Sequence, residues 1–174
     1  MNTLIGHVCL GLLTLSLLAV MARVTANAAT DSGEQIFVNQ AALGGMAEVE
    51  MGKVASDHAL SSEVRQFAAQ MISDHTKANE ELERIASEKL LRVPKDLDAE
   101  HKAKIDILRK KTGAEFDKSY MQAQVSDHDK MQQLLAAEAT NGKNADLKKF
   151  AVKILPTVRE HYQMAKELEA KVGK

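Results

Sequence analysis

An apolar stripe with one polar member runs along residues 64–85. Its members recur at alternating steps of four and three, the spacing that places residues on one face of a helix packed in a bundle. They are Val64, Ala68, Met71, His75, Ala78, Leu82 and Ile85. His75 stands where a leucine is expected, so its imidazole should point into the core. The segment therefore predicts a long amphipathic helix that buries a histidine.

Three other segments carry stripes with the same spacing. The first spans residues 37–58, and its helix is expected to begin at an N-cap among residues 30–32. The other two span residues 114–140 and 144–168, and Asn144 is the expected N-cap of the last. Four long helices are therefore expected, each with one face suited to a common core.

Turn signals separate these helices. Ser61 and Ser62 follow the first, Pro94 closes the second, and Asn141-Gly142 ends the third. Residues 96–111 form a shorter amphipathic segment before the third long helix. The sequence thus predicts an all-α four-helix bundle with a short extra helix in the connection between the second and third long helices. Whether this connection crosses the bundle or covers one end is left open.

Composition agrees with an all-helical chain and excludes some functions. Aromatic residues make up only 3% and proline occurs twice. A net charge of −1, with 27% charged residues, offers no basic patch for nucleic acid. Cys9 is the single cysteine and lies in the N-terminal apolar run, so neither a disulfide nor a cysteine metal site is expected in the folded part.

The N-terminus predicts export. Residues 4–22 are nearly all apolar, and Ala26-Asn27-Ala28 fits the small-x-small rule for signal peptidase. We therefore expect a signal peptide over residues 1–28, a single domain over residues 29–174, and a periplasmic or secreted mature protein. The alternative is a retained membrane anchor, because no lysine or arginine precedes the apolar run and the run is long enough to cross a bilayer.

Four polar residues are expected at one depth in the core. Glu48 lies about 12 residues before the first turn and His75 about 15 after it, so at ~1.5 Å per residue the two come level. His128 and His161 occupy stripe positions near the middles of their own helices. Each of the four long helices therefore contributes one polar residue to a common layer.

Such a layer is costly to bury unless its members pair or bind a cation. Three imidazoles and one carboxylate form a plausible site for zinc, copper, iron or manganese, with Glu48, His75, His128 and His161 as ligands. Asp74, Asp127 and Glu160 each precede one of the histidines and could orient an imidazole on a neighbouring helix. The alternative is a metal-free network in which these groups hydrogen-bond to one another and to the backbone.

Several enzyme classes lack their motifs in this chain. Carboxylate-bridged di-iron bundles need Glu-x-x-His on two helices, but Ile72, Val125 and Val158 stand three positions before the core histidines. No glycine-rich phosphate loop is present, and no serine or cysteine nucleophile adjoins a histidine in the expected core. We therefore assign no catalytic residue, and whether the protein is an enzyme stays open.

The chain resembles family 4142 of the domains of unknown function over about residues 34–170. The residues that carry this resemblance are Ala47-Glu48 with Gly52-Lys53; Val64, Phe67-Ala68, Met71, Asp74-His75-Thr76, Asn79 and Leu82; Phe116-Asp117, Tyr120 and His128; and Leu155-Pro156 with His161. The resemblance implies an exported bacterial protein with a ferritin-like four-helix fold. It also implies that Glu48 and the three core histidines are recurring polar positions, without assigning them a role.

Three functions remain compatible with these features. The first is an exported protein that binds a transition metal in its core. The second is a structural or interaction module of the cell envelope whose polar layer fixes helix register without metal. The third is a metal-dependent redox enzyme that uses the same site. The sequence specifies neither a substrate nor an oligomeric state.

If the signal peptide is cleaved, the mature protein begins at Ala29. N-terminal sequencing of the product recovered from the periplasm of an expressing bacterium should read Ala29 first. Recovery of the chain with Met1 in the membrane fraction would instead identify residues 4–22 as an anchor.

Overall fold

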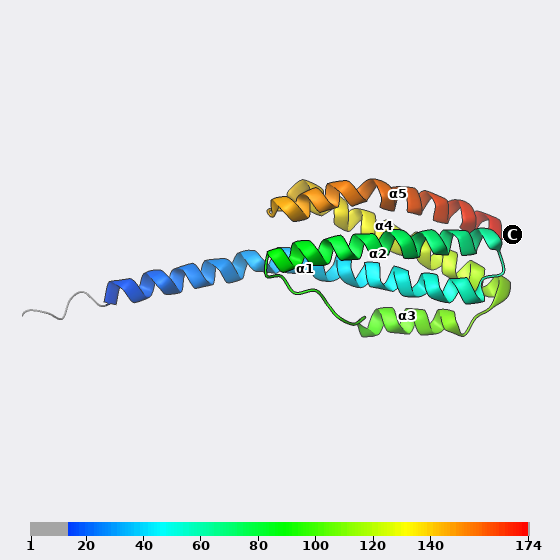
Figure 1. Ribbon diagram of the computed structural model, residues 1–174, viewed down its shortest axis with the longest axis horizontal. Coiled ribbons are helices and arrows are strands. Elements are labelled where there is room, and N and C mark those ends of the chain that lie inside the picture. The colour runs from blue at the N-terminus through cyan, green and yellow to red at the C-terminus, as the bar shows by residue number, and fades with distance from the viewer. Residues whose placement is uncertain (1–13, 174) are drawn as a thin grey trace, which may run out of the picture. The chain divides into compact units, whose positions relative to one another are not determined.

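The computed structural model describes the backbone of residues 14–173 and, from residue 33 onward, their side chains. Within this range the chain is all-α, and four long helices form a bundle (Figure 1), which confirms the expected fold class. The helices are α1 (Thr14–His58), α2 (Ser62–Glu88), α3 (Ala99–Arg109), α4 (Gly113–Asn141) and α5 (Ala145–Val172). The short α3 is the extra helix expected in the connection between the second and third long helices.

The described chain divides into two units, one ending at Gly33 and a bundle unit beginning at Glu34. The expected start of the first helix near residues 30–32 is wrong, because α1 is already helical from Thr14. Residues 14–32 contain no proline or glycine and are rich in alanine and leucine, so nothing in them ends a helix. The apolar run of residues 4–22 lies partly outside the described residues, and the signal peptide stays a prediction. None of the described helices is long and apolar enough to cross a membrane.

Polar side chains fix the starts of α2, α3 and α5. Ser61 accepts a hydrogen bond from the Val64 amide (3.4 Å), and Asp98 accepts one from the His101 amide (2.9 Å). Asn144 accepts from the amide of Leu147 (3.3 Å), which confirms it as the N-cap of α5. Each of these bonds satisfies an amide that has no partner within its own helix.

The connection through α3 crosses the bundle from end to end. Asp117, in the first turns of α4, accepts hydrogen bonds from the amides of Leu60 and Ser61 in the α1–α2 turn (3.0 and 2.8 Å). At the opposite end, Lys89 just after α2 pairs with Asp146 at the start of α5 (2.6 Å). Because α2 ends where α5 begins, and α4 begins at the other end, α3 must carry the chain back along the bundle, as Figure 1 shows. Helices α2 and α4 therefore run parallel, a point that the sequence left open.

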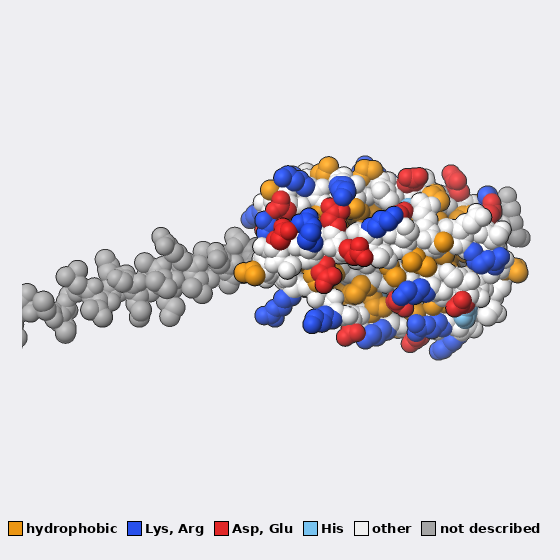
Figure 2. All heavy atoms as spheres, in the orientation of Figure 1, with side chains coloured by type: hydrophobic (Ala, Val, Ile, Leu, Met, Phe, Trp, Pro, Cys, Tyr) orange, Lys and Arg blue, Asp and Glu red, His pale blue; other side chains and the backbone are white. Residues whose placement is uncertain are grey.

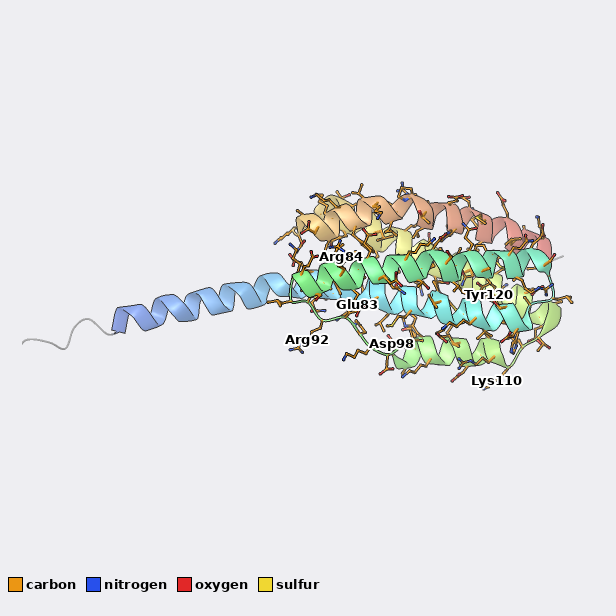
Figure 3. All side chains as sticks on the ribbon, viewed as in Figure 1. Glu83, Arg84, Arg92, Asp98, Lys110 and Tyr120 are labelled. Carbon is orange, nitrogen blue, oxygen red and sulfur yellow. The ribbon has the colours of Figure 1, made fainter. Side chains whose placement is uncertain are left out.

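The apolar core of the bundle consists of two clusters. One lies toward the α1–α2 turn, where Figure 3 labels Tyr120, and the other toward the α4–α5 turn. The largest buried members of the first are Met51, Phe67, Met71, Phe116, Tyr120 and Met121. Those of the second are Phe37, Leu82, Leu135, Leu147 and Phe150. Basic and acidic side chains are interspersed over the face drawn in Figure 2, so the charged surface on this side has no single sign.

A charge placed in the core should destabilise the bundle far more than one on its surface. Ala68 is fully buried, whereas the adjacent Ala69 on the same helix is exposed. Ala68→Glu should lower the free energy of unfolding by about 3 kcal/mol or more, through overpacking and an unpaired buried charge. Ala69→Glu should change it by less than about 0.5 kcal/mol. Urea unfolding of both variants measures the difference, and equal effects would contradict this placement of α2.

Candidate metal centre

A polar layer separates the two apolar clusters. Each long helix contributes one residue to this layer: Glu48 on α1, His75 on α2, His128 on α4 and His161 on α5. Along each helix, this residue lies between residues of one apolar cluster and residues of the other. The four side chains are only 4%, 6%, 1% and 1% exposed. The four predicted site residues therefore lie at one depth in the bundle. The structure also adds Gln124, fully buried one turn before His128, to this layer.

Three of the four residues converge on a common point. One ring nitrogen from each of His75, His128 and His161 lies within 4.8 Å of the other two. The three ring centroids form a nearly equilateral triangle with sides of 5.5 to 5.6 Å. We call these residues the histidine triad.

The shortest distance in the triad matches a metal site. Nε2 of His75 and Nε2 of His128 are 3.4 Å apart. Two nitrogens bound to one tetrahedral zinc ion at ~2.0–2.1 Å would be about 3.3–3.4 Å apart. A small inward movement of the third imidazole would therefore complete a three-nitrogen site.

Hydrogen bonds orient two of the three rings. Nε2 of His161 donates to Asp74 Oδ2 on α2 (3.2 Å), and Nδ1 of His161 is buried with no hydrogen-bond partner among the described residues. Nδ1 of His128 donates to the carbonyl oxygen of Gln124 (3.0 Å). Each of these bonds places the proton on the nitrogen that faces Asp74 or Gln124 and leaves a lone pair on the other nitrogen of the ring. Carboxylates and backbone carbonyls orient metal-binding histidines in this way.

In the metal-free protein, His75 and His128 share a hydrogen bond. Because Nδ1 of His128 carries a proton, its Nε2 is an acceptor, and the Nε2–H of His75 donates to it across the 3.4 Å separation. For a metal ion to bind between the two Nε2 atoms, the proton of His75 must lie on Nδ1 instead, so that both Nε2 lone pairs face the ion. The triad can therefore exist with or without a cation, and the metal assignment stays a prediction.

Glu48 lies beside the triad, on the outer side of His128. Its Oε2 accepts from Gln124 Nε2 (2.6 Å), and its Oε1 lies 3.8 Å from Nδ1 of His128, the nitrogen that faces away from His75. The carboxyl group is therefore not among the groups whose ligand atoms gather within 4.8 Å. The sequence could have indicated Gln124 as a partner, because it occupies the same helical stripe four residues before His128.

Burial sets the protonation states of the layer. It raises the pKa of Glu48 to about 8, with the nearby Asp127 carboxylate adding to the effect, so this carboxyl group is largely protonated at neutral pH. Burial also lowers the pKa of His128 to about 4 and lowers the pKa values of His75 and His161. The triad is therefore neutral at neutral pH, which is the form of imidazole that binds metals.

Of the three carboxylates expected to orient the histidines, only Asp74 bonds to one. Asp74 contacts His161 as described above, whereas Asp127 pairs with Lys104 on α3 (2.6 Å). Glu160 is exposed. The repeated sequence Ser-Asp-His, at residues 73–75 and 126–128, thus gives two different arrangements. The neighbouring helix decides which one forms.

Acid should destabilise the metal-free bundle. As the pH falls from 6.5 toward 4.5, the histidines of the triad take up protons in the unfolded chain but resist them in the fold, because their folded pKa values are lowered. Glu48 acts in the opposite sense, since it is protonated in the fold while the unfolded carboxyl, with a pKa of 4.5, is ionised. Three histidines outweigh one carboxyl group, so the free energy of unfolding should decrease through this window. Urea unfolding in chelator at several pH values measures it.

The variant His128→Gln should make this decrease shallower, by up to about 1.4 kcal/mol per pH unit. The same substitution at His58, which lies outside the polar layer and contacts the Lys111 carbonyl oxygen, is the matched control. Stability that is constant or rises toward pH 5 would contradict the buried, neutral state of the triad.

Comparisons with known proteins agree with this architecture. The crystal structure of a predicted secreted protein, DUF305, from Streptomyces coelicolor is similar to this chain, with a TM-score of 0.69 and 16% sequence identity, over 83% of this chain and 92% of that chain. At that identity the likeness shows the fold alone. No curated protein sequence matches the chain. The family described as Domain of unknown function (DUF4142) matches residues 19–168, which is most of the chain, so the protein belongs to the DUF4142 family.

Proposed function

We propose that this protein binds one transition-metal ion through His75, His128 and His161. The observation that carries the proposal is the convergence of three buried, neutral imidazoles from three helices, with ligand atoms within 4.8 Å of one another. The oriented rings of His128 and His161 support it, because each carries its proton on the nitrogen that bonds to Gln124 or Asp74 and has a lone pair on the other nitrogen. Asp74 acts by orienting His161, and Glu48 lies outside the ligand set.

The donor set favours zinc, copper or iron over manganese. Imidazole nitrogen suits zinc, copper, iron and nickel, whereas manganese prefers carboxylate and water oxygens. Because Glu48 lies beside Nδ1 of His128 and bonds to Gln124, the set offers three nitrogens and no oxygen. This makes manganese, one of the metals considered from the sequence, the least suited.

We place this function outside the cytoplasm. The apolar run of residues 4–22 and its cleavage signal support export, and the structural relative from Streptomyces coelicolor is itself described as secreted. We expect no nucleic-acid partner, and contact with the membrane only if the N-terminal segment is retained. The protein would then hold or buffer a metal ion in the cell envelope.

The competing function is a metal-free structural layer. The hydrogen bond between His75 and His128 favours it, because that bond pairs the two facing Nε2 atoms without a cation. A redox enzyme would need the same bound metal together with turnover of a substrate such as peroxide. Measuring whether metal binds separates the metal-free layer from the proposal. Turnover of peroxide or oxygen by the metal-loaded protein separates the redox enzyme from it.

Metal should raise the melting temperature of the wild-type protein. At a free metal concentration of 100 times Kd, binding to the folded state adds about 2.7 kcal/mol, which is roughly 10 °C for a domain of this size. His128→Ala should lose most of this increment, since a 100-fold weaker site retains only about 0.4 kcal/mol. Thermal unfolding of untagged protein is measured with chelator and then with zinc or copper. The melting temperature in chelator is the baseline of each variant, and the shift caused by metal is compared between variants.

Two matched pairs serve as controls. His58→Ala removes a histidine outside the layer and should leave the full metal-dependent shift. Asp74→Asn should weaken metal binding by roughly 10- to 100-fold, whereas Asp127→Asn, whose carboxylate pairs with Lys104, should weaken it much less. If no metal shifts the wild type more than His128→Ala, the layer is structural and the proposal fails.

A further inference from the structure

A pocket of about 450 Å³ leads from the surface to the histidine triad. It lies between α1, α4 and the start of α3, where Figure 3 labels Asp98. Its deepest residues are Glu48, His75 and His128, which are all buried. Lys104 and Asp127 line it nearer the surface, with side chains 27% and 16% exposed.

The pocket meets the triad on one side only. His75 and His128 line it, whereas His161 does not and instead contacts Asp74. A second cavity that touches His75 has a volume of only about 20 Å³, room for about one water molecule. The larger pocket falls in the range of small-ligand sites, which is about 300–1,000 Å³. A metal held by the triad would therefore be open to an external ligand from this side.

Charge balance indicates the kind of ligand. A divalent ion held by three neutral imidazoles keeps both of its positive charges in a layer between two apolar clusters. The Asp74 carboxylate, acting through His161, offsets one of them. Lys104 and Asp127 neutralise each other across 2.6 Å and leave the balance unchanged. One further negative charge at the open position would remove the uncompensated charge, which is costly to bury. Glu48 lines the same pocket, but it lies on the Nδ1 side of His128 and bonds to Gln124, so a small anion that enters through the pocket is the group placed to reach the open position.

We propose that the metal held by the triad binds a small exogenous anion at a coordination position that opens into this pocket. The inference rests on the proposed function and adds to it the class of ligand and the route of access. Gly44 on α1 and Met131 on α4 both line the pocket and lie in close contact. A Cβ atom added at Gly44 would lie only 2.5 Å from Met131 Cε. The absence of a side chain at Gly44 thus leaves room for the Met131 side chain in the lining of the pocket.

The test uses the full chain loaded with cobalt(II), whose visible spectrum responds to a new ligand, and azide as the small anion. Cobalt content is measured first. In the wild-type protein, azide should shift the spectrum in a saturable way with one site per metal. Leu43 and Leu134 are half-buried pocket residues on α1 and α4, so the double variant Leu43→Trp/Leu134→Trp narrows the pocket from both sides. It should keep its cobalt and bind azide roughly tenfold more weakly or worse, about 1.4 kcal/mol.

The control is Leu155→Trp/Met164→Trp, which changes two half-buried residues of α5 that do not line the pocket. It should titrate with azide like the wild type. Stoichiometric cobalt with no azide response in the wild type overturns the inference while the metal site stands, as do equal azide affinities in the two double variants. An azide response that appears only in Glu48→Gln would also overturn it, by giving the open position to the Glu48 carboxylate. A wild-type chain that takes up no cobalt overturns the metal site itself, and the inference with it.

Discussion

The burial of a polar layer between two apolar clusters is the constraint on which the rest of this structure depends. Three imidazoles, a carboxyl group and an amide cannot leave water without partners, because each unpaired group costs of order 1–3 kcal/mol. The bundle supplies several of these partners from neighbouring helices: Asp74 on α2 accepts from His161 on α5, and Gln124 on α4 donates to Glu48 on α1. Nδ1 of His161 and Oε1 of Gln124 stay without a partner among the described residues. The layer therefore ties helix register to the hydrogen bonds of the site. A sliding of one helix by a single turn would bring polar groups against one of the apolar clusters.

The crossover through α3 shapes the surroundings of the site. Because α2 and α4 run parallel, the two Ser-Asp-His segments point the same way along the bundle but meet different neighbours. Asp74 reaches the imidazole of His161, whereas Asp127 reaches Lys104 on α3. The start of α3 also forms the outer part of the pocket that ends at the triad. The same connection thus returns the chain across the bundle and gives one side of the triad access to solvent.

The fold by itself does not indicate a function, whereas the geometry of the site does. A bundle of this shape is shared with the DUF305 structure at 16% identity, and a shared fold carries no function by itself. The functional argument rests on particular atoms: a free lone pair on His161, a 3.4 Å nitrogen pair, and rings whose lowered pKa values keep them neutral. These features suit a cation.

The sequence by itself determined the helices, the faces that they bury and the depth of the four polar residues, because helical periodicity and distance from a turn are local properties of the chain. The start of α1 that the sequence predicted was wrong. Asp31 was a candidate N-cap, but such a residue does not mark the start of a helix when good helix formers precede it. Only the tertiary structure decided the crossover and the partners of each ring, including the position of Glu48 on the Nδ1 side of His128. The apolar pattern of a helix in the sequence predicts only the face of that helix on which a residue lies. How the helices are rotated and displaced against one another decides which nitrogen meets which neighbour, and that depends on contacts between residues far apart in the chain.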